Sequence, residues 1–139
     1  MRILVVEEGA GSNSTLVSAL RSDGHIVSSA STVDETLHLV AGQLYDVLVT
    51  DLNLPDGRAT DILARWKYRN SLIAIVLRDR GFPAEIEAYA EAGFQYHMVK
   101  PIDVACLKAL LPRRIWPSLK EQMVIHRMKR FAAAAPEER

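Results

Sequence analysis

Four ionisable residues stand at the ends of short apolar runs, and their types suit metal and phosphate chemistry. Glu7 and Glu8 come after the first such run, Asp51 after the third and Lys100 after the fifth. Mg²⁺ prefers oxygen ligands and commonly takes one or two carboxylates together with a phosphate oxygen. The four residues together carry a net charge of −2, which one Mg²⁺ would neutralise so that a phosphoryl donor could approach. Their types therefore predict a magnesium site that handles phosphate.

A parallel sheet is needed to bring these residues together. Short apolar runs alternate along the chain with segments of helical periodicity, which is typical of βα units. We expect strands at 3–6, 26–27, 47–49, 73–77 and 98–99, and the later helices at 61–68, from Pro83 to Gly93, and at 103–111. Thr32 and Glu35 predict a capping pair for the second helix. The fold class is therefore α/β, with a doubly wound five-stranded sheet whose ligands bind at the carboxyl ends of the strands.

The composition fits one domain and excludes several classes of protein. The chain has 139 residues, of which 49% are hydrophobic, and a formal net charge of zero. Its one cysteine, Cys106, excludes an internal disulfide, and the apolar residues around it predict core packing. No apolar stretch reaches the roughly 20 residues that a membrane span needs. The first residues lack a signal-peptide pattern, so we expect no membrane contact and a cytoplasmic protein.

Three motifs make the prediction more specific. They are ILVVEE at 3–8, VLVTDLNLPDG at 47–57, and AG at 92–93 followed by MVKPID at 98–103. In this order and spacing, over residues 1–111, the chain resembles the receiver domain of bacterial response regulators. The resemblance implies a flavodoxin-like fold with strand order 2-1-3-4-5 and a cis peptide bond before Pro101. It also implies a two-component signalling module rather than an enzyme.

The resemblance assigns a role to each residue at the strand ends. Asp51 would accept a phosphoryl group from a histidine kinase or a phosphotransfer protein. Lys100 would pair with the phosphoryl oxygens. Glu7 and Glu8 would hold Mg²⁺ together with Asp51 and the backbone carbonyl of Asn53.

Three positions depart from the family pattern. Glu8 stands where the family usually has the shorter Asp, and Mg²⁺ tolerates little deviation from octahedral geometry. Val76 is assigned to the position of a Thr or Ser hydroxyl, and His97 to that of an aromatic ring that turns inward on activation. A hydrogen bond to a charged group contributes about 1.5–3 kcal/mol, whereas inverting a 1:99 equilibrium takes about 5.5 kcal/mol. We therefore expect phosphorylation to shift this domain weakly or by another route.

The C-terminal part of the chain differs in charge from the rest. Residues 112–139 hold 7 Lys or Arg and 3 Asp or Glu, whereas residues 1–111 carry a net charge of −4. We expect a proline-bracketed connector at 112–117, an additional helix at 118–135 and a tail at 136–139. That helix would pack on its own domain, or form a homodimer or bind a partner. A direct nucleic-acid contact is the least favoured alternative, because no binding motif accompanies the basic residues.

Two other functions stay open at this level. A pseudo-receiver of the same fold would act as a phosphorylation-independent interaction or dimerisation module, with an inherited acidic pocket. An FMN or nucleotide enzyme of flavodoxin-like architecture would need a phosphate-binding loop. Residues 9–15 match such a loop only in part, because Ser14 stands where the third glycine is required. We interpret those residues as a loop and cap that lead into the first helix.

Overall fold

The computed structural model describes residues 1–9, 14–66, 71–80 and 85–111. The sequence predictions for the connector, the additional helix and the tail, at 112–117, 118–135 and 136–139, lie outside the described residues.

Five parallel strands form the central sheet. They are β1 (Arg2–Val6), β2 (Ile26–Ala30), β3 (Val47–Asp51), β6 (Ile73–Arg78) and β7 (Tyr96–Val99). The order across the sheet is β2-β1-β3-β6-β7, so the predicted order of the five main strands is confirmed. β3 lies in the middle and is buried along its whole length. Strands buried on both faces read as continuous apolar runs, which is why the sequence pattern showed them clearly.

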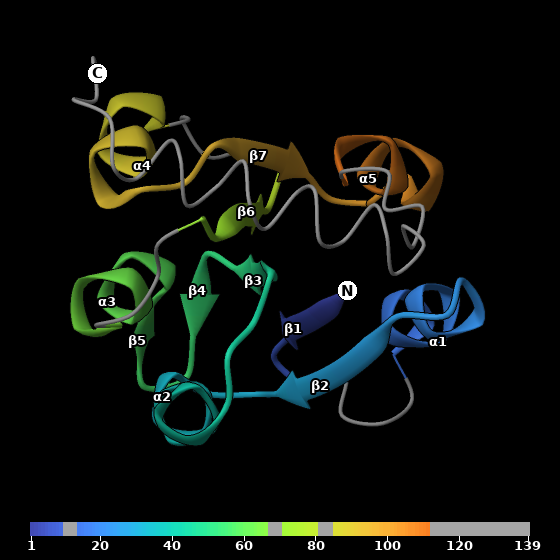
Figure 1. Ribbon diagram of the computed structural model, residues 1–139. Helices are drawn as coiled ribbons and strands as arrows, with labels where there is room; N and C mark the ends of the chain where they lie inside the picture. The colour runs from blue at the N-terminus through green and yellow to red at the C-terminus, as the bar shows by residue number, and fades with distance from the viewer. Residues whose placement is uncertain (10–13, 67–70, 81–84, 112–139) are drawn as a thin grey trace, which may run out of the picture.

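Helices cover both faces of this sheet (Figure 1). One face carries α1 (Thr15–Ser22) and α5 (Val104–Leu110), and the other carries α2 (Val33–Gly42), α3 (Ala59–Arg65) and α4 (Ile86–Ala92). Successive residues of a strand point to opposite faces, so the core divides into two clusters. Val5, Val49 and Leu77 belong to the cluster under α1 and α5. Leu4 and Val76 belong to the cluster on the other face.

Some local predictions were inaccurate. After β3 the chain forms a short antiparallel hairpin of β4 (Asn53–Leu54) and β5 (Gly57–Arg58), which the sequence did not indicate. α3 begins at Ala59, two residues before the expected start. The prediction that Cys106 packs in the core was wrong, because its side chain is exposed and the buried residue of α5 is its neighbour Leu107. Neighbouring residues on a helix point about 100° apart, and in α5 it is Leu107 that faces the core.

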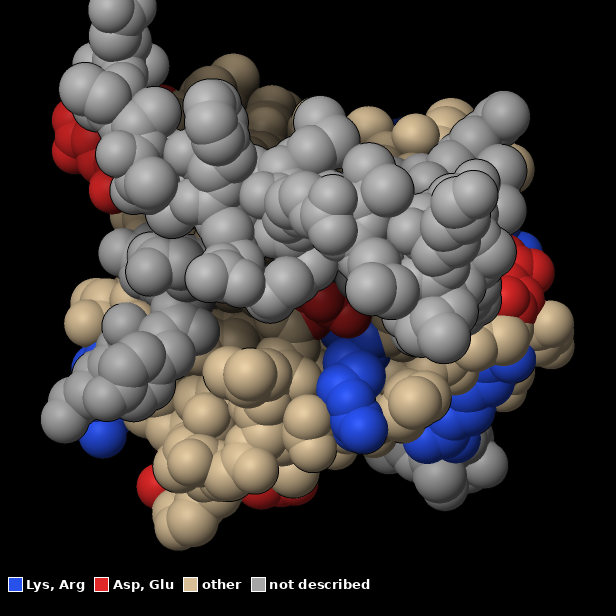
Figure 2. Space-filling model, in the orientation of Figure 1, with Lys and Arg blue, Asp and Glu red and all other residues tan. Residues whose placement is uncertain are grey.

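The described surface carries no large patch of one charge on the face drawn in Figure 2. There, the described acidic and basic side chains lie in separate small groups on a mostly uncharged surface. None of the helices in the described ranges has both the length and the hydropathy that crossing a membrane requires.

Substitution of Leu107 tests how much the packing of α5 contributes to the stability of the core. Leu107 is fully buried in the cluster under α1 and α5, so Leu107→Ala should lower the free energy of unfolding by about 2–5 kcal/mol. Leu44 is 71% exposed, and Leu44→Ala removes the same atoms with an expected change within about 0.5 kcal/mol. Urea denaturation followed by circular dichroism measures both variants. Equal losses would contradict the assignment of Leu107 to the core.

Candidate functional site

Asp51 ends the central strand and is almost completely buried. The residue is 5% exposed, and its carboxylate oxygen Oδ1 lies 2.7 Å from the Lys100 ammonium. The other oxygen, Oδ2, accepts a hydrogen bond of 3.0 Å from the backbone N–H of Glu8. Burying an isolated carboxylate is costly, and these two contacts offset that cost. The structure thus brings together residues that are 43 and 49 positions apart in the chain.

Lys100 reaches Asp51 because of how the chain leaves β7. Its backbone N–H donates to the Arg78 carbonyl at 2.9 Å, which continues the pairing of β7 with β6 beyond the end of the strand. The peptide bond between Lys100 and Pro101 is cis, as the sequence resemblance implied. At the matching place on β6, the backbone N–H of Leu52 donates to the Leu77 carbonyl at 2.7 Å. The ends of β3, β6 and β7 are therefore held in a common register.

The two acids after β1 have different surroundings. Glu7 is half-buried, and its carboxylate accepts a hydrogen bond from the hydroxyl of Ser14. Ser14 is the N-cap of α1 and is itself 5% exposed. The side chain of Glu8 is exposed, although its backbone N–H contacts Asp51.

A cavity of about 430 Å³ lies between the start of α1 and the connection from β7 to α5. Its charged lining residues are Glu7 and Lys100, and Ser14 and Thr15 add two hydroxyl groups. The rest of the lining is mainly apolar: Leu16, Pro101, Ile102 and Val104. Lys100 connects this cavity to Asp51, which it contacts but which is not itself a lining residue.

The donor chemistry of the site suits Mg²⁺, but the acids are not gathered around one point. Asp51 Oδ1 is buried and, apart from the charge of Lys100, has no directed hydrogen bond within the described residues. That oxygen retains lone pairs for a cation, and carboxylate oxygens are the ligands that Mg²⁺ prefers. However, no group of three or more His, Cys, Asp or Glu side chains in the described ranges is close enough to hold a metal ion. The residues fit the ion in type, and the side chains must rearrange to surround it.

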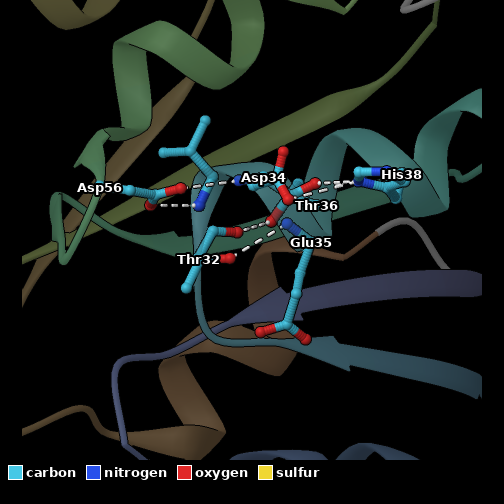
Figure 3. Close-up of polar contacts among 7 residues, drawn as sticks. Thr32, Asp34, Glu35, Thr36, His38 and Asp56 are labelled. Carbon is cyan, nitrogen blue, oxygen red and sulfur yellow. Dashed lines mark hydrogen bonds and ion pairs between the residues drawn. The ribbon is translucent and has the colours of Figure 1, made fainter.

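The loop that follows Asp51 is anchored to a helix far away in the sequence (Figure 3). Asp56 lies between the two strands of the hairpin, and its carboxylate accepts hydrogen bonds from the N–H groups of Val33 at 2.7 Å and Asp34 at 3.0 Å. These N–H groups belong to the first turn of α2, where the helix itself offers them no partner. Thr32 completes the cap, because its hydroxyl accepts from the Glu35 N–H at 3.0 Å. The hairpin that carries Asn53 is thereby tied to α2.

Val76 does not lie at the end of its strand, because β6 continues to Arg78, and its assignment as a switch position stays a prediction. In the sheet register, Asp51 pairs with Leu77, whereas Val76 pairs with Thr50 and His97. The side chain of Val76 packs in the cluster on the opposite face. A continuous apolar run does not show which of its residues point to which face, so its sequence alone could not decide the register. Leu77 and Arg78, the last two residues of β6, also lack a hydroxyl.

His97 lies on the edge strand β7 and packs against α4. Its ring centroid is 6.1 Å from that of Tyr89, at an interplanar angle of 52°. The ring nitrogen Nδ1 is buried and has no hydrogen-bond partner in the described part of the chain. The neighbouring Tyr96 is 41% exposed. The ring thus lies inward in this structure, while a switch role for His97 stays a prediction.

Comparison with known proteins agrees with this geometry. The model of the response regulator receiver domain family matches residues 3–111. The chain belongs to this family. Receiver domains are signalling modules of two-component systems, so this assignment confirms the fold and the family that the sequence motifs indicated.

Curated relatives match most of this chain and about half of their own length. The virulence transcriptional regulatory protein PhoP of Salmonella typhimurium (strain LT2) is 31% identical over 119 residues, which are 81% of this chain and 53% of that protein. The KDP operon transcriptional regulatory protein KdpE of Escherichia coli K12 is 29% identical and is matched over 78% of this chain and 48% of its own length. The chain therefore spans about half the length of these relatives.

Solved structures show the same fold. The non-phosphorylated HemR receiver domain of Leptospira biflexa superimposes with a TM-score of 0.68 and 28% identity, covering 83% of this chain and 98% of that domain. The receiver domain of a Pseudomonas aeruginosa sensor histidine kinase, which has a magnesium ion in its active-site cleft, gives a TM-score of 0.65 and 25% identity. That match covers 78% of this chain and 92% of that domain.

Two contacts of the site were not foreseen from the sequence. Ser14 was interpreted only as a helix cap, and its bond to Glu7 has no local signal. Asp56 appeared only within the motif at 47–57, because the helix that it caps begins 23 positions earlier.

The Asp56 carboxylate should make the stability of the fold depend on pH. Its hydrogen bonds from the N–H groups of Val33 and then Asp34 hold the pKa of this carboxyl below its usual range. A lowered pKa in the folded state stabilises the fold at pH values above the unfolded pKa of about 4, and this contribution is lost as pH falls through the folded pKa. Asp56→Asn should therefore destabilise the protein at pH 7, and the difference from wild type should disappear as pH falls below the folded-state pKa. Thermal unfolding of wild type and Asp56→Asn from acidic to neutral pH measures this difference in stability. A difference that stays the same at every pH would contradict the prediction.

Proposed function

We propose that this receiver domain accepts a phosphoryl group on Asp51 from a histidine kinase or a phosphotransfer protein in the cytoplasm, and signals through protein contacts. The observation that carries the proposal is the buried Asp51 carboxylate paired with the Lys100 ammonium at 2.7 Å. A nucleophilic carboxylate paired with a fixed cation suits phosphoryl transfer, and the same cation lines a cavity.

The transfer is an in-line displacement. An oxygen of Asp51 attacks the phosphorus of a phosphohistidine, the phosphorus–nitrogen bond breaks, and the imidazole leaves with the electron pair. Lys100 follows the developing negative charge from the carboxylate to the phosphoryl oxygens, while the Glu8 N–H keeps the remaining carboxylate oxygen oriented. Glu7, Glu8, Asp51 and the carbonyl of Asn53 would hold Mg²⁺. The ion would supply charge neutralisation, because a phosphoryl group carries about −1.5 to −2 charges.

Two features of the chain disfavour a conformational switch that responds to phosphorylation. Leu77 lies beside Asp51 in the register and has no hydroxyl with which to hold a phosphoryl oxygen. His97 already packs inward against Tyr89. These two observations favour a second candidate, a pseudo-receiver that binds partners or dimerises without phosphorylation. With either function, the phospho-accepting receiver or the pseudo-receiver, we propose that residues 118–135 could form a homodimer. We propose no direct contact with nucleic acid.

Labelling with a small phosphodonor tests the leading proposal. Wild-type protein incubated with Mg²⁺ and acetyl phosphate should gain the mass of one phosphoryl group at Asp51, and Asp51→Asn should gain none. Lys100→Met should slow labelling by about 10²-fold, because it removes the cation that stabilises the transferred group. Mass spectrometry of the intact protein and its peptides measures all three.

Lys108 provides a matched control for Lys100. The two lysine side chains are 35% and 36% exposed, and each pairs with one aspartate, Lys108 with Asp23 at 3.0 Å. Lys108→Met should therefore label as wild type does. If wild type is not labelled at Asp51 at saturating donor, the pseudo-receiver is the better description.

A further inference from the structure

We propose that Ser14 is a positioning residue that holds Glu7 away from the metal site, so that Mg²⁺ binding must first break the Ser14–Glu7 hydrogen bond. The inference rests on the proposed function, since it concerns the ion that would serve Asp51. It assigns to Ser14 a control of metal affinity in addition to its role as a helix cap.

Ser14 is fixed in place by two contacts made by one oxygen. Its hydroxyl accepts a hydrogen bond from the Val17 N–H at 3.2 Å, which caps α1, and donates its own proton to the Glu7 carboxylate. Ser14 is only 5% exposed, so the packing around it holds its hydroxyl in this position. Glu7 is therefore tied to the first turn of α1 by a contact that the folded helix keeps in position.

Each partly or fully buried acid of the site is thus occupied by a protein donor. Asp51 is paired with Lys100 and the Glu8 N–H, and Glu7 is paired with Ser14. In this arrangement no three acidic side chains in the described residues converge on one point. A cation that uses the Glu7 oxygen bound to Ser14 has to compete with that hydroxyl for it.

The same contact shapes the cavity beside Asp51. Glu7, Ser14 and Lys100 are all among the residues that line it. Release of Glu7 would leave the buried Ser14 hydroxyl with only its cap contact to Val17. The Ser14–Glu7 hydrogen bond therefore stabilises the metal-free arrangement. The stronger this bond is, the lower the Mg²⁺ affinity should be.

Thr32 is a matched control within the same chain. Like Ser14, it caps a helix with a side-chain oxygen that accepts from the N–H three residues later, at 3.0 Å for Thr32 and 3.2 Å for Ser14. The acid that contacts the α2 terminus next to Thr32 is Asp56, which is outside the proposed metal site. Removing either hydroxyl costs a helix cap, and only the loss of Ser14 frees a proposed metal ligand.

Calorimetric titration with Mg²⁺ tests the proposal on the full chain. Ser14→Ala should bind Mg²⁺ about tenfold more tightly than wild type, the change that corresponds to losing one hydrogen bond to a charged group. Thr32→Ala should bind like wild type, even though both substitutions lower the melting temperature by a similar amount. In a Glu7→Gln background, Ser14→Ala should no longer change the affinity, because the two residues act through one contact.

The outcomes separate this inference from the proposed function. Unchanged or weaker Mg²⁺ binding by Ser14→Ala, or a gain that persists with Glu7→Gln, would overturn the role of Ser14. If wild type binds Mg²⁺ and is labelled at Asp51 in the same samples, the proposed function survives that result. Absence of Mg²⁺ binding in every variant would overturn both the role of Ser14 and the metal site.

Discussion

The buried pair of Asp51 and Lys100 is the interaction on which the rest of this structure depends. A carboxylate that is 5% exposed needs a compensating charge, and the cation comes from a strand two positions away in the sheet. That cation is available only when β6 lies between β3 and β7 in a fixed register. The order of the strands, the packing of both helical layers and the connection after β7 all serve to keep this pair together.

In this structure the acids of the site are bound by groups of the protein itself, and they are not already arranged around a metal position. The partly and fully buried acids are bound by an ammonium, a backbone N–H and a hydroxyl, each from a different part of the chain. Such contacts lower the cost of concentrating negative charge at one edge of the sheet. They also mean that a cation or a phosphoryl group has to displace existing partners. Affinity at this site is therefore set by those partners as much as by the acids themselves.

Helix ends are the second means by which the fold holds its functional loops. Ser14 links the start of α1 to Glu7, and Asp56 links the start of α2 to the hairpin after Asp51. In both cases a side chain satisfies N–H groups that the helix leaves without a partner, and a loop of the site is restrained by the same contact. The stability of the two helices and the geometry of the site are consequently coupled.

The sequence by itself determined the fold class, the strand order implied by the resemblance, and the acids and the lysine at the strand ends. It could do so because buried parallel strands are short continuous apolar runs, and the ends of such strands meet at one edge. Tertiary structure alone decided that Leu77 rather than Val76 lies beside Asp51, since an unbroken apolar run carries no alternation that reveals its facing. It also decided the contacts of Ser14 and Asp56, because pairing between distant segments depends on packing and leaves no local pattern.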